Sequence, residues 1–160
     1  MNTRCLIGVT TIATCAIRAC QMVQITVPIG VTHIGRGAFE DCGNLKSISL
    51  PEGLTVLEDN LFCHCSNLEN LVIPESVTSI GGVGGSKPLP TGSVFLMCEK
   101  LTAIKLPKNL THLSAYAFQG SSITSIVLPG KIEKVPDGAF RCCFETLSLQ
   151  KSLFLTESKQ

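Results

Sequence analysis

The chain has 160 residues, of which 44% are hydrophobic and 16% are charged, and its formal net charge is +1. With no run of lysine or arginine, this balance argues against the basic surfaces that bind nucleic acid or anionic membranes. No stretch of about 18 uninterrupted apolar residues occurs, so the sequence predicts no membrane-spanning helix.

The first twenty residues, MNTRCLIGVTTIATCAIRAC, loosely imitate a secretory signal because a basic residue precedes an apolar stretch. A repeat explains them better. Four of them precede a residue of the same type by 22 positions: Val9, Ile12, Ala16 and Cys20. We therefore expect residues 1–20 to form a degenerate first repeat, with Ile17 in the place of a recurring phenylalanine. The chain begins inside this repeat, as a piece of a longer array would.

Two markers recur along the rest of the chain with matching spacing. The first is a phenylalanine, whose successive sequence numbers differ by 23, 33, 23 and 22: Phe39, Phe62, Phe95, Phe118 and Phe140. The second is a proline after an apolar triplet, with differences of 23, 23, 33 and 22: Pro28, Pro51, Pro74, Pro107 and Pro129. Both series show one ten-residue insertion in the same turn. Fixed-period self-similarity of this kind is typical of a solenoid.

The segment before each proline is predicted to be a strand. In LKSISLP (45–51), Ile48 and Leu50 alternate with serines, which is the pattern of a half-buried strand. The proline ends the strand because it has no N–H group for the ladder. Equivalent strands must then lie side by side in parallel, about 4.8 Å apart. The same strand is expected at LENLVIP (68–74), LTAIKLP (101–107), ITSIVLP (123–129) and FETLSLQ (144–150).

The rest of each repeat returns the chain to the next strand. Aliphatic residues such as Val77 and Ile80 are expected to turn inward, and the Ala-Phe segment to form a short helical or 3₁₀ turn on the outer side. Beyond residue 150 the pattern decays, so we expect residues 150–160 to form a C-terminal tail or cap. The elements together predict an α/β solenoid of about six to seven turns of 22–23 residues, with residues 1–160 in a single domain.

The stretch SISLPEGLTVLEDNLFCHCSNLENLVIPESVTSIG resembles the BspA-like, or treponemal-type, leucine-rich repeat, whose unit of about 23 residues reads LxxIxLPxxVxxIgxxAFxxC. The similarity covers residues 5 to 149. Its departures are the insertion, Ser121 in a cysteine position, and short deletions near Val23, Ile123 and Cys143. The resemblance implies a right-handed superhelix with a parallel β-sheet on its concave face. It also implies a non-enzymatic role, since relatives are typically surface or secreted adhesion and interaction proteins of bacteria and some protozoa.

Cysteine recurs at one place in the repeat, three residues after the phenylalanine mark. The residues there are Cys20, Cys42, Cys65, Cys98 and Cys143. Because this position repeats with the fold, we expect buried, reduced thiols that fill the core and donate weakly to a neighbouring turn. The alternative is a ladder of disulfides, which is disfavoured because stacked side chains point the same way. Nine cysteines also leave one without an intramolecular partner.

Three motifs invite comparison with a zinc site, a catalytic triad and a phosphate-binding loop, but each is better explained as part of the repeat or as a surface feature. CHC (63–65) lacks the second pair of ligands that a zinc site needs, so we predict neither a metal nor a cofactor. His33 and His112 precede inward-facing aliphatic residues and are expected at the surface, where no spacing indicates a catalytic triad. GGVGGSKPLPTGS (81–93) has no Gly-Lys followed by Ser or Thr, so it is not a phosphate-binding loop. We expect a Gly/Pro-rich insertion loop on the surface.

A binding role would use the side chains that point out of the concave sheet, in two columns. The first is Gln24, Ser47, Asn70, Ala103, Ser125 and Thr146, and the second is Thr26, Ser49, Val72, Lys105, Val127 and Ser148. Only Lys105 is charged, and Val72 and Val127 flank it. This small, partly apolar face suits an extended peptide, a second protein or another copy of the chain. The alternative is that small residues there only relieve crowding.

Two hypotheses for function follow. The first is a non-enzymatic, adhesion-like module that binds a protein partner, extracellular or on a host, through the concave sheet. The second is a structural homo-oligomer that assembles through the apolar concave face and encloses a hydrophobic ligand. The location stays open: the resemblance implies the cell surface or secretion, whereas the unpaired thiols and the lack of a convincing signal peptide favour a reducing compartment.

Overall fold

The computed structural model describes residues 8–82, 92–143 and 148–151. Ten short strands follow one another along the chain: β1 (Thr11–Ile12), β2 (Gln24–Thr26), β3 (His33–Ile34), β4 (Ser47–Ser49), β5 (Val56–Leu57), β6 (Asn70–Val72), β7 (Ser79–Ile80), β8 (His112–Leu113), β9 (Ser125–Leu128) and β10 (Ser148–Lys151). Every strand pair is parallel. The described residues therefore form a β-solenoid. The solenoid with parallel strands agrees with the prediction, whereas the predicted α/β class is not confirmed because the described residues contain no helix.

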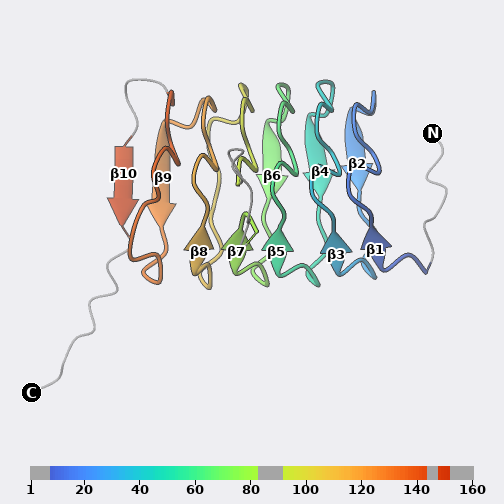
Figure 1. Ribbon diagram of the computed structural model, residues 1–160, viewed down its shortest axis with the longest axis horizontal. Helices are drawn as coiled ribbons and strands as arrows, with labels where there is room; N and C mark the ends of the chain where they lie inside the picture. The colour runs from blue at the N-terminus through green and yellow to red at the C-terminus, as the bar shows by residue number, and fades with distance from the viewer. Residues whose placement is uncertain (1–7, 83–91, 144–147, 152–160) are drawn as a thin grey trace, which may run out of the picture.

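The strands lie in two rows (Figure 1). One row, which we call the β2 row, contains the ladder β2-β4-β6 and the pair β9-β10. The other contains the pair β1-β3 and the ladder β5-β7-β8. Each strand lies next to its equivalent from the neighbouring turn, because equal spacing along the chain brings equal positions together. The number of turns and the right-handed sense of the superhelix stay predictions.

The first repeat lies in register with the second. Thr11 pairs with His33 and Ile12 with Ile34, as the offset between the two repeats predicts. Ile17 takes the place of the phenylalanine and packs partly buried against the core. Its amide N donates to the carbonyl of Ala38 at 2.9 Å, so this turn is attached to the next one beyond the strand as well.

The outer turns are not helical in the part of the chain that the structure describes. An α-helix needs each N–H to reach the carbonyl four residues back. Here alternate N–H groups reach the next turn instead: that of Gly37 donates to Asp59 at 3.0 Å and that of Phe39 to Leu61 at 3.1 Å. Gly37 and Asp41 both have φ of 60°, a left-handed conformation that interrupts a right-handed helix. The expected helical or 3₁₀ turns are therefore not confirmed.

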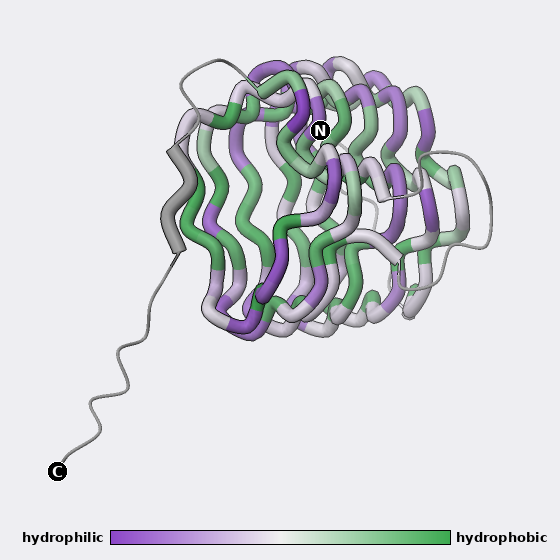
Figure 2. Tube along the Cα trace, turned by 60° about the vertical axis from the view of Figure 1, so that its left-hand side comes forward, coloured by the Kyte–Doolittle hydropathy of each residue, from purple (hydrophilic) through white to green (hydrophobic). Residues whose placement is uncertain are grey.

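The core is a column of aromatic rings lined by aliphatic side chains. Successive rings of the five recurring phenylalanines lie with centroids 5.7, 5.6, 5.0 and 5.4 Å apart and planes within 12° of parallel. Phe39, Phe62, Phe95 and Phe118 are fully buried, and Phe140 is partly buried. Hydrophobic residues recur at corresponding places in successive turns (Figure 2). The predicted aromatic spine is confirmed.

Two features of the β2 row differ from the sequence prediction. The segment 101–107 was expected to be a strand, but it belongs to no strand, so the ladder stops at β6 and resumes at β9. Its inward residues Ile104 and Leu106 are nevertheless buried. In addition, β10 pairs Ser148 with Ser125, whereas the columns predicted Ser148 beside Val127. The spacing from Ser125 to Ser148 equals that from Ser47 to Asn70, so the deletion expected near Cys143 does not shorten this turn. β10 also extends to Lys151, inside the predicted tail.

The glycines at the two ends of the ten-residue insertion lie against the same buried serine, Ser114. Gly81 and Gly92 have φ of 91° and 106°, and an added Cβ atom at either would lie within 2.5 Å of the Ser114 side chain. The Ser114 hydroxyl donates to the carbonyl of Gly92 at 2.5 Å. The predicted surface loop itself, within residues 81–93, lies mostly outside the described residues.

Candidate interaction face

The two predicted columns lie side by side across the β2 row, on a surface that we call the column face. Register pairs Gln24 with Ser47 and Ser47 with Asn70, and it aligns Thr26, Ser49 and Val72 in the same way. The exposed members are Gln24, Thr26, Ser49, Asn70, Val72, Ala103, Lys105, Ser125 and Val127, while Ser47 is half-buried. Ser148 pairs with Ser125 rather than Val127, and Thr146 lies outside the described residues.

The column face is hollowed where its ladder is interrupted. A hollow of about 750 Å³ lies over the segment 103–106, between β6 and β9. The buried side chains of Leu71, Ile104 and Ile126 contribute to its lining. Val72 and Val127, which are 81% and 52% exposed, lie on its two sides. Clefts of several hundred Å³ with an apolar lining and a few polar groups are typical binding sites.

Two lysines, Lys105 and Lys108, line this hollow. The carboxylate of Glu75, which is not part of the lining, contacts the side chain of Lys105 and the main chain of Lys108. Lys105 is 82% exposed, and its Nζ lies 3.7 Å from Oε1 of Glu75. Oε2 of Glu75 accepts a hydrogen bond from the backbone N–H of Lys108 at 3.0 Å. This backbone hydrogen bond is the main reason why the pKa of Glu75 lies below its usual value. Glu75 is therefore a carboxylate anchored to the main chain, and its ion pair with Lys105 is open to water.

The N-terminal half of the same face has a different lining. A second hollow, of about 540 Å³, lies over β2, β4 and β6. The side chains of Thr26, Ser49 and Glu52 contribute to it, and no lysine or arginine of the described residues does. The column face thus has an N-terminal half whose hollow is lined by one acidic and no basic residue, and a more apolar C-terminal half whose hollow is lined by two lysines and one glutamate.

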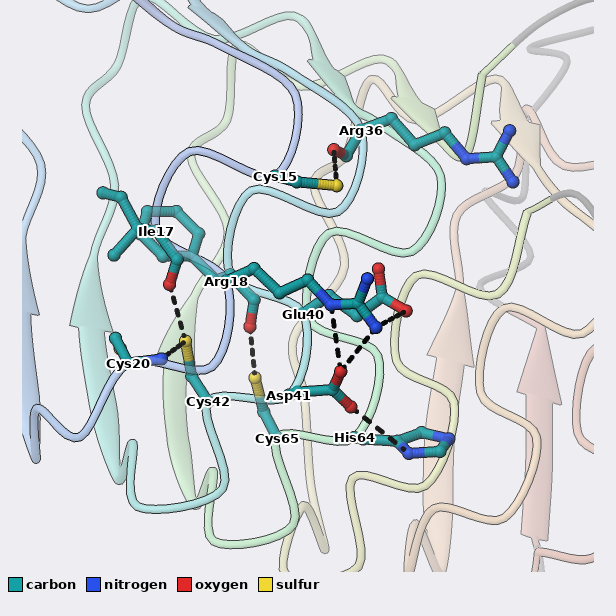
Figure 3. A network of polar contacts seen from close by, with 11 residues as sticks. Cys15, Ile17, Arg18, Cys20, Arg36, Glu40, Asp41, Cys42, His64 and Cys65 are labelled. Carbon is teal, nitrogen blue, oxygen red and sulfur yellow. Dashed lines mark hydrogen bonds and ion pairs between the residues drawn. The ribbon is translucent and has the colours of Figure 1, made fainter.

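Of the five recurring cysteines, Cys42, Cys65 and Cys98 are buried thiols as predicted, whereas Cys20 and Cys143 are only partly buried. Each of the three buried thiols donates to the carbonyl of the residue at the phenylalanine position in the preceding turn, at 3.1 to 3.2 Å. Figure 3 shows two of these bonds, from Cys42 to Ile17 and from Cys65 to the preceding turn. Burial raises the pKa of Cys42 to about 12 and that of Cys98 well above its usual value. These thiols are therefore protonated core residues, and nucleophilic chemistry would need thiolates.

The sequence analysis did not predict a polar cluster on the outer turns, formed by Arg18, Asp41 and His64. Arg18 donates from Nε and Nη2 to Oδ2 of Asp41 at 3.0 and 2.8 Å, and Nδ1 of His64 lies 3.6 Å from Oδ1 of Asp41 (Figure 3). The signal that could have found it is the spacing of its members, which lie exactly one repeat apart. All three side chains are more than a third exposed, so the Arg18–Asp41 ion pair is a surface contact of modest stabilising effect.

The other residues considered for chemistry are dispersed. Cys63 and Cys65 are buried whereas His64 between them is exposed, so the CHC motif does not converge on one point. Over the described residues, no three His, Cys, Asp or Glu side chains are placed to hold a metal ion. His33 is exposed, as predicted, but His112 is half-buried. Within the same ranges there is no helix that could cross a membrane.

Comparison with known proteins shows what kind of repeat this is. A family model described as the BspA type leucine rich repeat region matches residues 3–83 and 91–158 in six copies. The chain belongs to the BspA-type leucine-rich repeat family. The resemblance inferred from the Ala-Phe and cysteine marks is thereby confirmed. Proteins of this family and their structural neighbours are generally non-enzymatic scaffolds.

Solved structures of bacterial proteins share the fold. A leucine-rich repeat protein of T. pallidum has a TM-score of 0.79 and 30% identity, with 91% of this chain and 64% of that chain covered. A leucine-rich repeat protein from Bacteroides ovatus has a TM-score of 0.73 and 25% identity, covering 91% and 38%. A leucine rich cell surface protein from Faecalibacterium prausnitzii has a TM-score of 0.60 and 26% identity, covering 91% and 30%. The chain thus spans less than two thirds of each of these proteins. No curated protein matches it significantly.

Proposed function

We propose that the chain is a non-enzymatic interaction module that binds a protein partner through the C-terminal half of the column face. The observation that carries this proposal is the hollow between β6 and β9, in which Val72 and Val127 are exposed on either side of Lys105. Exposed aliphatic side chains around a concave surface are typical of sites where another protein excludes water.

The fold supports the same proposal. In a solenoid each turn contacts only its neighbours, and the repeated strands display side chains over an extended surface without using them in the core. Family membership agrees, because leucine-rich repeats typically serve as protein-interaction modules. The structural neighbour from Faecalibacterium prausnitzii is a cell surface protein, and the same location would suit an adhesion-like role for this chain.

The test is a quantitative pull-down with a double variant, Val72→Glu with Val127→Glu. We expect this variant to lose the proteins that the unchanged chain captures, because a partner would have to bury two carboxylates. The matched control is Ile29→Glu with Val135→Glu, which adds the same charges at exposed aliphatic residues that line neither hollow. The control should retain the partners. If both double variants capture the same proteins as the unchanged chain, the column face is not the binding site.

The second candidate function, a homo-oligomer assembled through the same apolar half, makes a different prediction. Self-association through Val72 and Val127 would give a molar mass that rises with protein concentration and that falls to the monomer value in the double variant. Light scattering measures this mass directly. A mass that stays at the monomer value at every concentration would exclude the homo-oligomer while leaving the partner-binding proposal intact.

A further inference from the structure

The charges around the hollow allow the chemistry of its occupant to be specified, on the basis of the proposed function. Among the described residues of the two columns, Lys105 is the only charged one. Lys108 also lines the hollow, as does one acidic residue, Glu69. Oε1 of Glu69 lies 4.0 Å from Nζ of Lys100, a lysine that does not line this hollow. Glu69 thus has its ion pair with a lysine outside the hollow.

The ammonium group of Lys105 is only loosely neutralised. Its distance of 3.7 Å from Oε1 of Glu75 is longer than a hydrogen bond, and both side chains are at least half exposed. Glu75 is in addition held by the backbone N–H of Lys108 through its other oxygen. A carboxylate that arrived with a partner would therefore meet an ammonium group on a side chain that is 82% exposed, and Glu75 would need no rearrangement.

The apolar residues around Lys105 indicate which side chains a partner must present together with that carboxylate. Val72 from β6 and Val127 from β9 lie on opposite sides of the Lys105 segment and line the same hollow. Successive residues of an extended peptide point to opposite faces, so a carboxylate and the aliphatic side chains on either side of it contact the face together when the peptide turns at its acidic residue. The N-terminal hollow offers no such pairing among the described residues, because its lining contains Glu52 and no lysine.

We propose that the hollow binds a short peptide segment of a partner protein in which an acidic side chain lies between aliphatic ones, with the carboxylate on Lys105 and the aliphatic groups on Val72 and Val127. The hollow of about 750 Å³ accommodates a few residues, not a folded domain. The rest of the partner would contact the surrounding column face.

Fluorescence anisotropy with synthetic peptides tests this proposal. The probe is fluorescein-labelled Gly-Ser-Val-Asp-Val-Ser-Gly, compared with counterparts that carry Asn or Lys in place of Asp. We expect the acidic peptide to bind about fivefold more tightly than the Asn peptide, the scale of one solvent-accessible ion pair. This preference should shrink as sodium chloride is raised, because salt screens exposed charges.

Charge reversal in the protein sharpens the test. Lys105→Glu should lose the preference for the acidic peptide and favour the Lys counterpart. The matched control, Lys100→Glu, makes the same change at an exposed lysine that also lies beside a glutamate but outside this hollow, and it should keep the wild-type order. Failure of all three peptides to bind the unchanged chain, or equal binding of all three, would overturn the inference. Loss of captured partners in the Val72→Glu, Val127→Glu variant would still support the proposed function in either case.

Discussion

At the scale of single residues, the recurring cysteine connects adjacent turns. Its thiol donates to a carbonyl of the preceding turn, and the one exception shows why the residue type matters. Ser121 occupies the cysteine position, but its hydroxyl donates to Phe118 in its own turn at 2.8 Å. Cys143 in the next turn donates to the same carbonyl at 3.2 Å. The Ser121 hydroxyl also lies 3.5 Å from the thiol of Cys143, but among the bonds to main-chain carbonyls only the longer cysteine side chain reaches the preceding turn.

The buried thiols predict a loss of stability at alkaline pH. Burial raises the pKa of Cys42 and Cys63 to about 12, and it also raises that of Cys65 and Cys98. The unfolded chain releases these protons at ordinary thiol pKa values near 9, so above that pH it binds fewer protons than the folded chain. Their stabilising effect is therefore complete below about pH 8.5 and is lost as the pH rises toward 12.

Urea denaturation in the presence of a reductant, at pH 8 to 11, measures this loss. We expect the midpoint of the unchanged chain to fall steeply above pH 9. A variant with Cys42→Ala and Cys98→Ala should start lower at pH 8 and fall less steeply. Parallel curves for the two proteins would show that these thiols do not titrate differently in the folded and unfolded chains.

At the scale of elements, the aromatic column and the base of the insertion carry the sharpest predictions. Phe62 lies between two parallel rings, at 5.7 and 5.6 Å, and is fully buried. Phe62→Ala should therefore lower the free energy of unfolding by about 3–5 kcal/mol, since it removes a buried aromatic side chain and leaves a cavity. Phe140 stacks on one ring among the described residues and is partly buried, so Phe140→Ala should cost clearly less. Chemical denaturation compares the two, and equal losses would contradict the observed arrangement.

The base of the insertion predicts an intolerant glycine. Gly92 has φ of 106°, and a Cβ atom there would lie 2.5 Å from Cβ of Ser114. Gly92→Ala should destabilise the fold by about 1–3 kcal/mol, the range for backbone strain of this kind. Gly30→Ala is the control, because its Cβ atom would meet nothing closer than the Val9 carbonyl oxygen at 3.6 Å. Thermal melting should separate the two variants, and similar midpoints would refute the assigned conformation of Gly92.

Much of each element was predictable because the period alone determines which residues meet. Gln24, Ser47 and Asn70 lie one repeat apart, so their alignment followed from the sequence once the strands were taken as parallel. The predicted position of Ser148 was wrong because a deletion was assumed in a turn that keeps the full spacing. The outer turns were misjudged as helical because the sequence pattern does not show that the N–H of Phe39 is used by the next turn.

The hollow in the column face could not be predicted in the same way. LTAIKLP at 101–107 has the same alternation as its neighbours, and its inward residues are buried accordingly. Whether its main chain joins the ladder depends on small displacements between turns, which side-chain alternation does not encode. The two columns therefore identified Val72, Lys105 and Val127, but not the cavity that brings them to a common site.

At the scale of the whole molecule, stability in a solenoid is distributed over contacts between neighbouring turns. The polar cluster of Arg18, Asp41 and His64, the thiol bonds and the aromatic column all join one turn to the next. A molecule built in this way places corresponding residues of successive turns in similar environments, so the members of the column face from Gln24 to Val127 are exposed apart from the half-buried Ser47. The proposed binding site depends on this property, because a shift of one residue would exchange buried and exposed positions.

Labelling of the natural cysteines with N-ethylmaleimide, followed by mass spectrometry of each peptide, tests this register most directly. Cys15 and Cys142 are exposed, whereas Cys65 and Cys98 are fully buried. In the native protein we expect the first two to react at nearly the rate seen in urea and the last two to be protected until the chain unfolds. Reaction of Cys65 and Cys98 as fast as Cys15 would contradict the stacking of turns on which the column face depends.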